Sequence, residues 1–200
     1  MTKLNKLFTL GLISLSMFLW ACSGGTGGTG DGSVAASPAE ALPASGDTAV
    51  PDSGAVNETL TPRDLTLDSS ANRVLVIDPE RKAVITIDLA SGASSILSDS
   101  TKPDSANTFE DPRGIAVDES GSRALVVDAA RKAIIAVDLT TGARSVFSSN
   151  TAPSGQVLFN NPLGIVIDSV NSRALVADSG LQAVVAVDLS SGERTLLESN

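Results

Sequence analysis

The fold of this 200-residue chain is decided by residues 112–150, which read PRGIAVDESGSRALVVDAARKAIIAVDLTTGARSVFSSN, and by their close copy at residues 162–200, PLGIVIDSVNSRALVADSGLQAVVAVDLSSGERTLLESN. A third and more divergent copy occupies residues 62–100. The copies are spaced by 50 residues and align without gaps. Repeats of this length are typical of solenoids, propellers and arrays, in which each copy folds as one unit.

Polar and turn residues recur in phase in all three copies. They are Pro62, Pro112 and Pro162; Asp68, Asp118 and Asp168; Arg73, Arg123 and Arg173; Asp78, Asp128 and Asp178; Asp88, Asp138 and Asp188; and Gly92, Gly142 and Gly192. Residues of this kind end strands and form turns. Their regular recurrence indicates that the three copies share one local structure.

Each copy contains four short runs with the composition of β-strands. In the second copy these runs are Gly114–Asp118, Arg123–Asp128, Ala133–Asp138 and Arg144–Ser148. The middle two are almost continuously apolar, which is typical of strands buried on both faces. The fourth is mixed, as expected for an outer strand. The sequence therefore predicts an all-β fold built from three four-stranded antiparallel sheets, and no stretch favours a long helix.

The repeat motifs add a family resemblance. The segments Pro-x-Gly-Ile-Ala-Val-Asp, Leu-Val-Val-Asp and Ile-Ala-Val-Asp-Leu-x-x-Gly resemble the NHL repeat and six-bladed β-propellers of the TolB-like and gluconolactonase type. A weaker resemblance is to YVTN surface-layer propellers, whose Tyr and Asn are absent. The resemblance implies three propeller blades, about residues 62–100, 112–150 and 162–200. The first copy has Asp64 where the others have Gly114 and Gly164, which suggests an atypical terminal blade.

Three blades do not close a propeller, because propellers use about four to eight blades so that no long sheet edge stays open. Two explanations are open. The chain is a fragment whose further blades are absent, or two copies pair as half-rings. The first is favoured, because tethered half-rings would have to find one another to be stable.

The N-terminal residues have the features of an export signal. Lys3 and Lys6 precede the apolar run Leu7–Ala21, which is shorter than the ~20 residues that a spanning helix needs. A charged start, a short apolar centre and a small residue before the break describe a secretory signal over residues 1–21. The alternative is a short membrane anchor.

The segment Leu19-Trp20-Ala21-Cys22 resembles the lipobox of bacterial lipoproteins. The resemblance implies cleavage before Cys22 and its acylation, and several acyl chains anchor a protein stably where one does not. Ser23 then favours the outer membrane, facing the periplasm or the cell surface. Residues 22–58 are Gly, Ser, Thr, Ala and Pro-rich and predict a disordered tether before the folded part, residues 59–200.

Composition excludes several classes of function. The chain carries 14 basic and 23 acidic residues, a formal net charge of −9, with no His and no Tyr. Without His, neither a Ser-His-Asp nor a Cys-His catalytic site can be built. Cys22 is the one Cys, so the chain lacks the Cys and His ligands of a structural zinc site and cannot form a disulfide within itself. A chain this acidic is a poor nucleic-acid binder, since phosphate contacts need basic patches.

The candidate binding face follows from blade topology. The turn after the second strand of each blade lies on the same face as the long blade-to-blade connections, and in the resembled families this face binds ligands and partners. An arc of Asp78, Asp128 and Asp178 there would hold Ca²⁺ through oxygen ligands or attract a cationic group. The alternative is turn capping. Arg81 and Arg131 follow on the same turns, either as part of this face or as solvated partners of the aspartates.

Other recurring residues favour structural roles. We expect the aspartates at positions 68, 118 and 168 and at 88, 138 and 188 to cap turns, and the arginines at 73, 123 and 173 to pair with a neighbouring Asp of the repeat. Gly114 and Gly164 are expected to allow close backbone packing. Phe109 and Phe159, in the long connections, are expected to fill the gaps between blades.

These observations predict a non-enzymatic, lipid-anchored envelope propeller that binds a protein or a small ligand. The alternative is a metal-dependent lactonase-like hydrolase of the gluconolactonase type, whose metal is held by acidic and Asn ligands. No ligand motif of that family can be placed residue by residue, and fold alone does not imply activity. A third possibility is a structural spacer of the envelope. Apart from the Ca²⁺ considered above, no cofactor is predicted.

Overall fold

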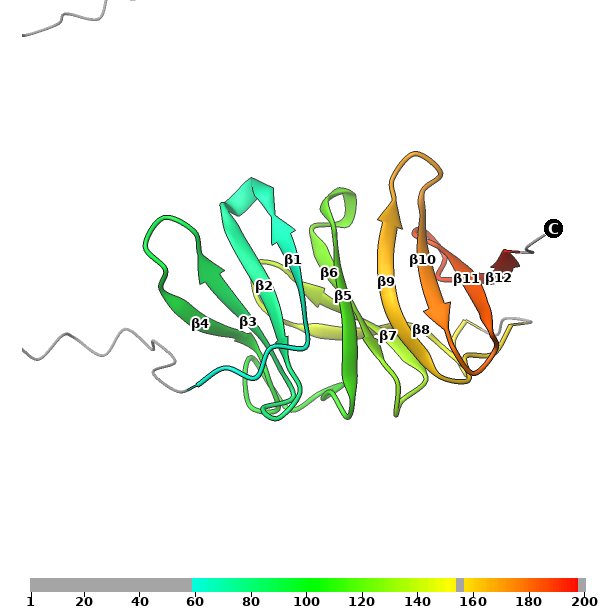
Figure 1. The fold of residues 1–200 in the computed structure, drawn as a ribbon, viewed down its shortest axis with the longest axis horizontal. Coiled ribbons are helices and arrows are strands. Elements are labelled where there is room, and N and C mark those ends of the chain that lie inside the picture. The colour runs from blue at the N-terminus through cyan, green and yellow to red at the C-terminus, as the bar shows by residue number, and fades with distance from the viewer. Residues whose placement is uncertain (1–58, 154–156, 198–200) are drawn as a thin grey trace, which may run out of the picture. The chain divides into compact units, whose positions relative to one another are not determined.

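The computed structural model describes residues 59–153 and 157–197, and these residues form three separate four-stranded antiparallel sheets. The predicted signal peptide, Cys22 and the tether over residues 22–58 lie outside the described residues. In Figure 1 the three sheets stand next to one another in chain order, and we call them the first, second and third blade. The predicted all-β architecture is confirmed.

Within each blade the strands follow one another in chain order from one edge to the other. The strands are β1 (Asp64–Asp68), β2 (Arg73–Asp78), β3 (Ala83–Asp88) and β4 (Ser94–Ser98) in the first blade; β5 (Pro112–Asp118), β6 (Arg123–Asp128), β7 (Ala133–Asp138) and β8 (Arg144–Ser149) in the second; and β9 (Pro162–Asp168), β10 (Arg173–Asp178), β11 (Ala183–Asp188) and β12 (Arg194–Leu197) in the third. In the second blade, β5 begins two residues earlier than predicted and β8 ends one residue later.

The first turn of each blade is held by the aspartate that ends the first strand. In the second blade Asp118 accepts a hydrogen bond from Gly121 N at 3.2 Å, across a short 3₁₀ turn over Glu119–Gly121. Ser122 then takes a left-handed conformation, with φ of 49°, and returns the chain into β6. Asp68 holds the 3₁₀ turn Ser69–Ala71 of the first blade in the same way. The capping role predicted for these aspartates is confirmed.

The third turn of each blade needs a glycine for its backbone conformation, and in the second and third blades that glycine also leaves room for the preceding blade. Gly92, Gly142 and Gly192 have φ of 72°, 75° and 74°, a backbone conformation that side chains strain. At Gly142 a Cβ atom would also lie 2.0 Å from the carbonyl oxygen of Leu97 in the preceding blade. At Gly92, in the first blade, nothing lies within 4 Å of that position. The glycine therefore serves its own turn in every blade and a blade-to-blade contact in the second and third.

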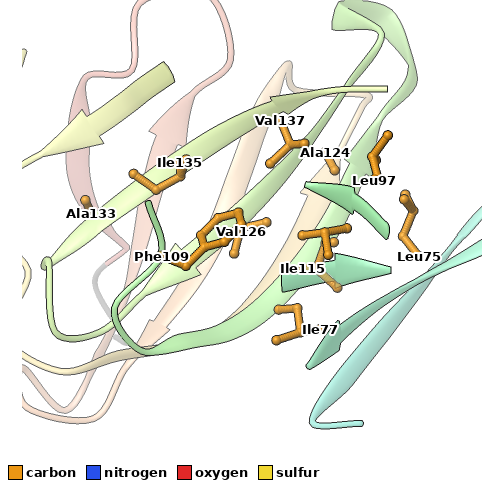
Figure 2. Packing of buried hydrophobic residues seen from close by; sticks show 11 residues of the cluster. Leu75, Ile77, Leu97, Phe109, Ile115, Ala124, Val126, Ala133, Ile135 and Val137 are labelled. Carbon is orange, nitrogen blue, oxygen red and sulfur yellow. The ribbon is translucent and has the colours of Figure 1, made fainter. Parts of the chain in front are cut away.

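The hydrophobic core lies between blades and not inside any one of them. The first core joins buried side chains of the first blade, such as Leu75 and Ile77, to Ile115 and Val126 of the second. Figure 2 shows Phe109, from the connection between the two blades, lying against Val126 in this core. Phe109 is 2% exposed, so its predicted role of filling the gap between blades is confirmed.

The second core is built in the same way, between the second and the third blade. Leu125 and Ile134 of the second blade pack with Val176 and Val185 of the third, and Phe159 fills the gap. Phe159 is 1% exposed. A central blade is thus apolar on both faces, which explains why its middle strands read as continuous apolar runs.

The first strands of neighbouring blades, β1, β5 and β9, lie in contact with one another. A Cβ atom at Gly114 would lie 2.6 Å from the carbonyl oxygen of Leu163, so the close backbone packing predicted for Gly114 is confirmed. Gly164 has open space at that position. In the first blade Asp64 replaces the glycine, and its Oδ2 accepts a hydrogen bond of 2.9 Å from Ile115 N.

Among the described residues no helix is long and apolar enough to cross a membrane.

Candidate functional site

The three aspartates of the predicted binding face fasten the connections between blades. Asp128, at the end of β6, is fully buried. Its Oδ2 accepts a hydrogen bond of 2.7 Å from Glu110 N, and its Oδ1 accepts bonds of 3.1 Å from Asp111 N and from Arg131 N. One carboxylate therefore ties the chain entering the blade to the turn after β6.

The other two blades repeat this arrangement. Asp178 Oδ2 and Oδ1 each accept a bond of 2.8 Å, from Asn160 N and Asn161 N. Asp78 accepts bonds from Thr61 N at 3.2 Å and from Thr61 Oγ1 at 2.7 Å. Burial would raise the pKa of Asp78, but hydrogen bonds from Arg81 and Thr61 outweigh it and lower that pKa from 3.8 to about 2.

Arg81 and Arg131, the two basic residues of the predicted face, turn back onto the same connections. Arg81 Nη1 lies 2.6 Å from Asp78 Oδ2 and donates to the Thr59 carbonyl at 3.0 Å. Arg131 Nη1 donates to the Thr108 carbonyl at 2.7 Å. Both guanidinium groups therefore hold the chain that enters their own blade.

This geometry bears on the expected cation site. Asp78, Asp128 and Asp178 are 0%, 0% and 1% exposed, and each carboxylate accepts hydrogen bonds from its own blade's entry segment and turn. A cation could reach these oxygens only by displacing those donors. Over residues 59–153 and 157–197, no group of three acidic or Cys side chains is arranged to hold a metal ion. The geometry matches turn capping, the alternative interpretation.

The recurring Asp–Arg pairs are structural within each blade. Arg73, Arg123 and Arg173 lie 2.8, 2.9 and 2.9 Å from the aspartate that ends the preceding strand. Each pair crosses the first hairpin, since the two residues are register partners in the antiparallel ladder. The predicted ion pairs are confirmed, and they stay inside their own blade.

The remaining recurring aspartates cap the third turns. Asp138 accepts hydrogen bonds from Thr140 N at 3.0 Å and from Thr141 N at 2.7 Å, and these bonds lower its pKa. Asp188 makes the equivalent bonds to Ser190 and Ser191, which lower its pKa to about 2. The capping prediction for these positions is confirmed.

Two arginines that hold the connections between blades were missed by the sequence reasoning. The Arg144 side chain is 0% exposed and donates to carbonyl oxygens of Lys102 at 3.0 Å and Asp104 at 2.6 Å. Its guanidinium also lies over the ring of Phe109, 5.7 Å from the centroid. Arg194 lies over Phe159 in the same way at 5.2 Å. The signal was present, because both arginines recur at the 50-residue spacing.

A hollow of about 510 Å³ lies at the opposite end of the blades, where the first strands meet their first turns. All three blades contribute to it. Its apolar lining is Leu67, Val117, Ile167 and Leu189, and its polar lining is Thr66, Asp118, Glu119, Ser120, Ser169, Ser172 and Ser190. No residue of the predicted binding face lines it.

The polar side chains that line this hollow differ in whether they already make hydrogen bonds. The Asp118 carboxylate accepts hydrogen bonds from Ser120 and Arg123. In contrast, the hydroxyl groups of Thr66, Ser169 and Ser172 make no hydrogen bond to the described part of the chain. Beside them Leu67 is 54% exposed. The hollow therefore offers uncommitted neutral donors and acceptors next to exposed apolar surface, a combination that suits binding.

Comparisons by sequence find no matching protein family and no matching curated protein. Comparisons by structure find many. A chain in the crystal structure of a nidogen/laminin complex superposes with a TM-score of 0.56 at 19% identity, covering 68% of this chain and 48% of that one. A protein of unknown function from Bacteroides thetaiotaomicron superposes with a TM-score of 0.51 at 19% identity, covering 68% and 33%.

A third similar structure, the Kuenenia stuttgartiensis hydrazine synthase, has a TM-score of 0.49 at 18% identity and covers 68% of this chain and 34% of that one. The present chain spans less than half the length of each of these three structures. At such identities, likeness extends to the fold and not to the activity. Together with the three four-stranded antiparallel sheets, the first two similarities show that residues 59–153 and 157–197 form blades of a β-propeller.

Proposed function

We propose that this chain is a lipid-anchored propeller of the bacterial envelope that acts as a binding module for a protein or a small ligand. The recurring charged side chains support the scaffold: the carboxylates at the strand ends accept turn, linker and arginine hydrogen bonds in every blade. Such a scaffold presents its exposed turns at fixed positions, which is how rigid folds carry binding sites.

The observation that carries the binding proposal is the hollow at the first turns. It draws lining residues from three blades, and it combines the exposed Leu67 with the uncommitted hydroxyls of Thr66, Ser169 and Ser172. An apolar surface with a few convergent neutral polar groups fits an uncharged polar ligand or a polypeptide segment. Two carboxylates line the hollow: Asp118 is paired with Arg123, and Glu119 accepts a hydrogen bond of 2.8 Å from Ser69.

The test places a photo-crosslinking amino acid in the hollow in living cells. We expect the Leu67→benzoylphenylalanine chain to give one discrete cross-linked product. The same substitution at Val146, a 38% exposed residue of the outer strand β8, serves as the control and is expected to give none. Adding Ser172→Trp to fill the hollow should remove the product. A chain that gives no product from position 67, or the same product from position 146, would contradict the proposed site.

Lipid anchoring rests on the sequence Leu19-Trp20-Ala21-Cys22 and on the polar tract that follows it. We expect a palmitate label on the wild-type chain and none on Cys22→Ser. Because Cys22 is the one Cys in the chain, no second thiol can take the label. Label that persists in the variant refutes the anchor and leaves the binding proposal untouched. Fractionation of the labelled envelope then checks the expected outer-membrane location.

The family assignment that we propose is the NHL and TolB-like group of propellers. It is supported by the motif Pro-x-Gly-Ile-Ala-Val-Asp, whose glycine makes the close approach between β5 and β9 described above. The lactonase alternative has no such support, since it needs a metal held by acidic and Asn ligands.

A further inference from the structure

Asp64 departs from the repeat at a position where the other two copies have glycine. It begins β1, and its Oδ2 accepts a hydrogen bond of 2.9 Å from Ile115 N in the neighbouring blade. Its other carboxylate oxygen, Oδ1, accepts no hydrogen bond from the described part of the chain. One oxygen of this carboxylate is therefore structural, and the other is available to a ligand.

The arginines beside the starts of β1 and β5 do not pair with Asp64. Arg63 Nη1 lies 2.6 Å from Asp111 Oδ1, and Arg113 Nη2 lies 2.7 Å from Asp111 Oδ2. Both guanidinium groups are thus directed to the connection that enters the second blade. Within residues 59–153 and 157–197, Asp64 consequently has no cationic partner.

Asp64 lines a groove of about 330 Å³ that runs along the first strands of the three blades. These strands, β1, β5 and β9, lie side by side (Figure 1). Every lining residue other than Asp64 and Thr66 is apolar, and Val117 and Ile167 are among them. Asp64 is thus the one ionisable side chain of an otherwise apolar groove.

The groove is continuous with the hollow that carries the proposed function. Thr66, Val117 and Ile167 line both of them. Asp64 and Thr66 lie on the same side of β1, because they are two residues apart in a strand, and about 7 Å of strand separates them. A ligand held at the hydroxyl groups of the hollow can therefore extend an apolar chain along the groove to Asp64.

We propose that the groove takes a lysine side chain from a partner polypeptide whose backbone lies in the hollow, and that the ammonium group of this lysine donates to Asp64 Oδ1. The inference deepens the proposed function and rests on it. The four-carbon stem of lysine packs along Val117 and Ile167 while its charged end reaches the carboxylate. The neutral hydroxyl groups of the hollow donate to and accept from the peptide groups of the partner.

The single available oxygen favours lysine over arginine. A guanidinium pairs best with both oxygens of a carboxylate, but Oδ2 of Asp64 is held by Ile115 N. A lysine ammonium is a compact point charge for which one oxygen suffices. An uncharged side chain of the same length would leave Oδ1 unpaired beside apolar surface, which is unfavourable. The groove therefore selects for the charge of its occupant as well as for its length.

The test titrates the full chain with the blocked tripeptide alanyl-lysyl-alanine and follows backbone amide signals by nuclear magnetic resonance. We expect the amide of Ile115, which donates to Asp64, to shift together with the amides of Ser169 and Ser172 in the hollow. The matched tripeptide with norleucine keeps the apolar stem without the charge and should bind about tenfold more weakly. The tripeptide with arginine should also bind more weakly than the one with lysine.

Two variants separate the charge of Asp64 from its structural bond. Asp64→Asn removes the charge but keeps an oxygen that accepts from Ile115 N, so we expect the wild-type melting temperature and no preference for lysine over norleucine. Asp104→Asn is the matched control, because it removes the same charge from a side chain that is 55% exposed in the connection between the first two blades. This control should keep the full preference for lysine.

Equal affinity for the lysine and norleucine tripeptides overturns the inference, and so do tighter binding of the arginine tripeptide and the absence of any shift. The same holds if Asp64→Asn keeps the preference or if Asp104→Asn loses it. The comparison of tripeptides on the wild-type chain stands even if Asp64→Asn melts at a lower temperature, since it needs no variant.

Cross-linking from position 67 distinguishes failure of this inference from failure of the proposed function. We expect Asp64→Asn to reduce the product that the Leu67→benzoylphenylalanine chain gives in cells. An equal product with and without Asp64→Asn leaves the hollow as a binding site and overturns the lysine contact. If the chain with the native Asp64 gives no product at all, the proposed function fails, and this inference fails with it.

Discussion

The guanidinium of Arg144 donates a hydrogen bond of 2.6 Å to the hydroxyl of Ser98, which lies 46 residues earlier in the chain and in the preceding blade. That hydroxyl donates in turn to the carbonyl of Gly142 at 2.8 Å. Arg194, Ser148 and the carbonyl of Gly192 repeat this relay at 2.6 and 2.8 Å. Neighbouring blades are therefore joined by a buried polar relay in addition to their apolar core.

Replacing Arg144 should show what this relay contributes. Lysine keeps the charge but cannot reproduce the planar set of donors that reaches Ser98, Lys102 and Asp104. We expect Arg144→Lys to lower the free energy of unfolding by about 3 kcal/mol, because buried acceptors lose their donors. Urea denaturation of dilute protein measures this. Arg63→Lys is the control, as the Arg63 side chain is 38% exposed, and it should cost about 0.5 kcal/mol. Equal losses in both variants would contradict the role of Arg144.

The turn glycines allow strain and contact to be separated. Gly92 and Gly142 have nearly the same backbone conformation, with φ of 72° and 75°. An alanine at either position is therefore under the same backbone strain. Only at Gly142 does a Cβ atom meet another blade, 2.0 Å from the carbonyl of Leu97. We expect Gly142→Ala to lower the melting temperature of dilute protein several degrees more than Gly92→Ala does. Calorimetry of both variants checks this, and equal shifts would count against the blade-to-blade contact.

The role of Asp128 predicts a local change in amide exchange. Asparagine at this position offers one acceptor oxygen where the carboxylate offers two, and its NH₂ group would face backbone donors. We expect Asp128→Asn to cost about 2 kcal/mol and to speed hydrogen exchange at Glu110 and Asp111, whose amides donate to the carboxylate. Glu193→Gln, an exposed change, should leave exchange at both positions as it is in the wild type. Unchanged exchange in Asp128→Asn would refute the assignment.

Stability should fall steeply in acid. The folded state lowers the pKa of Asp78 from 3.8 to about 2 and also lowers the pKa values of Asp68 and Asp118, so folding favours the ionised carboxylates. Their contribution is complete above the unfolded pKa, near pH 4, and is lost as the pH falls toward about 2; for Asp78 alone it is about 2 kcal/mol. Denaturation curves between pH 7 and pH 2 test this. Asp78→Asn should flatten the acid limb, and an equally steep limb in that variant would contradict the assignment.

Calcium should have little effect on the described blades. The carboxylates of Asp78, Asp128 and Asp178 already accept backbone hydrogen bonds, so a cation gains few free ligands there. We expect the same melting temperature in millimolar Ca²⁺ and in EDTA. A rise of several degrees with Ca²⁺ would revive the cation site considered from the sequence, and with it the lactonase alternative.

The fold could be predicted closely because the repeat supplies the same information three times. Asp118, Asp128 and Asp138 each end a strand, and the predicted ends of those strands match the observed ones. A single copy would be ambiguous, since a run such as residues 133–138 is apolar throughout. In three aligned copies, the positions that keep Asp and Gly mark where the strands stop.

The direction in which side chains face could not be predicted in the same way. Asp78 and Asp128 end their strands just before turns that look exposed in the sequence, yet the entering chain covers them, and that contact joins segments 17 residues apart. Arg144 looked like an ordinary polar residue of an outer strand, because its partners lie in a connection whose path the repeat does not encode. The hollow at Leu67 needs three blades in place before it exists.

Each internal core joins two adjacent blades, and the same register positions supply it every time. A protein assembled in this manner can be lengthened by duplicating a 50-residue segment of its gene, since the new unit arrives with both of its mating surfaces already compatible. The alignment of the three copies without gaps is what growth by that route would leave behind.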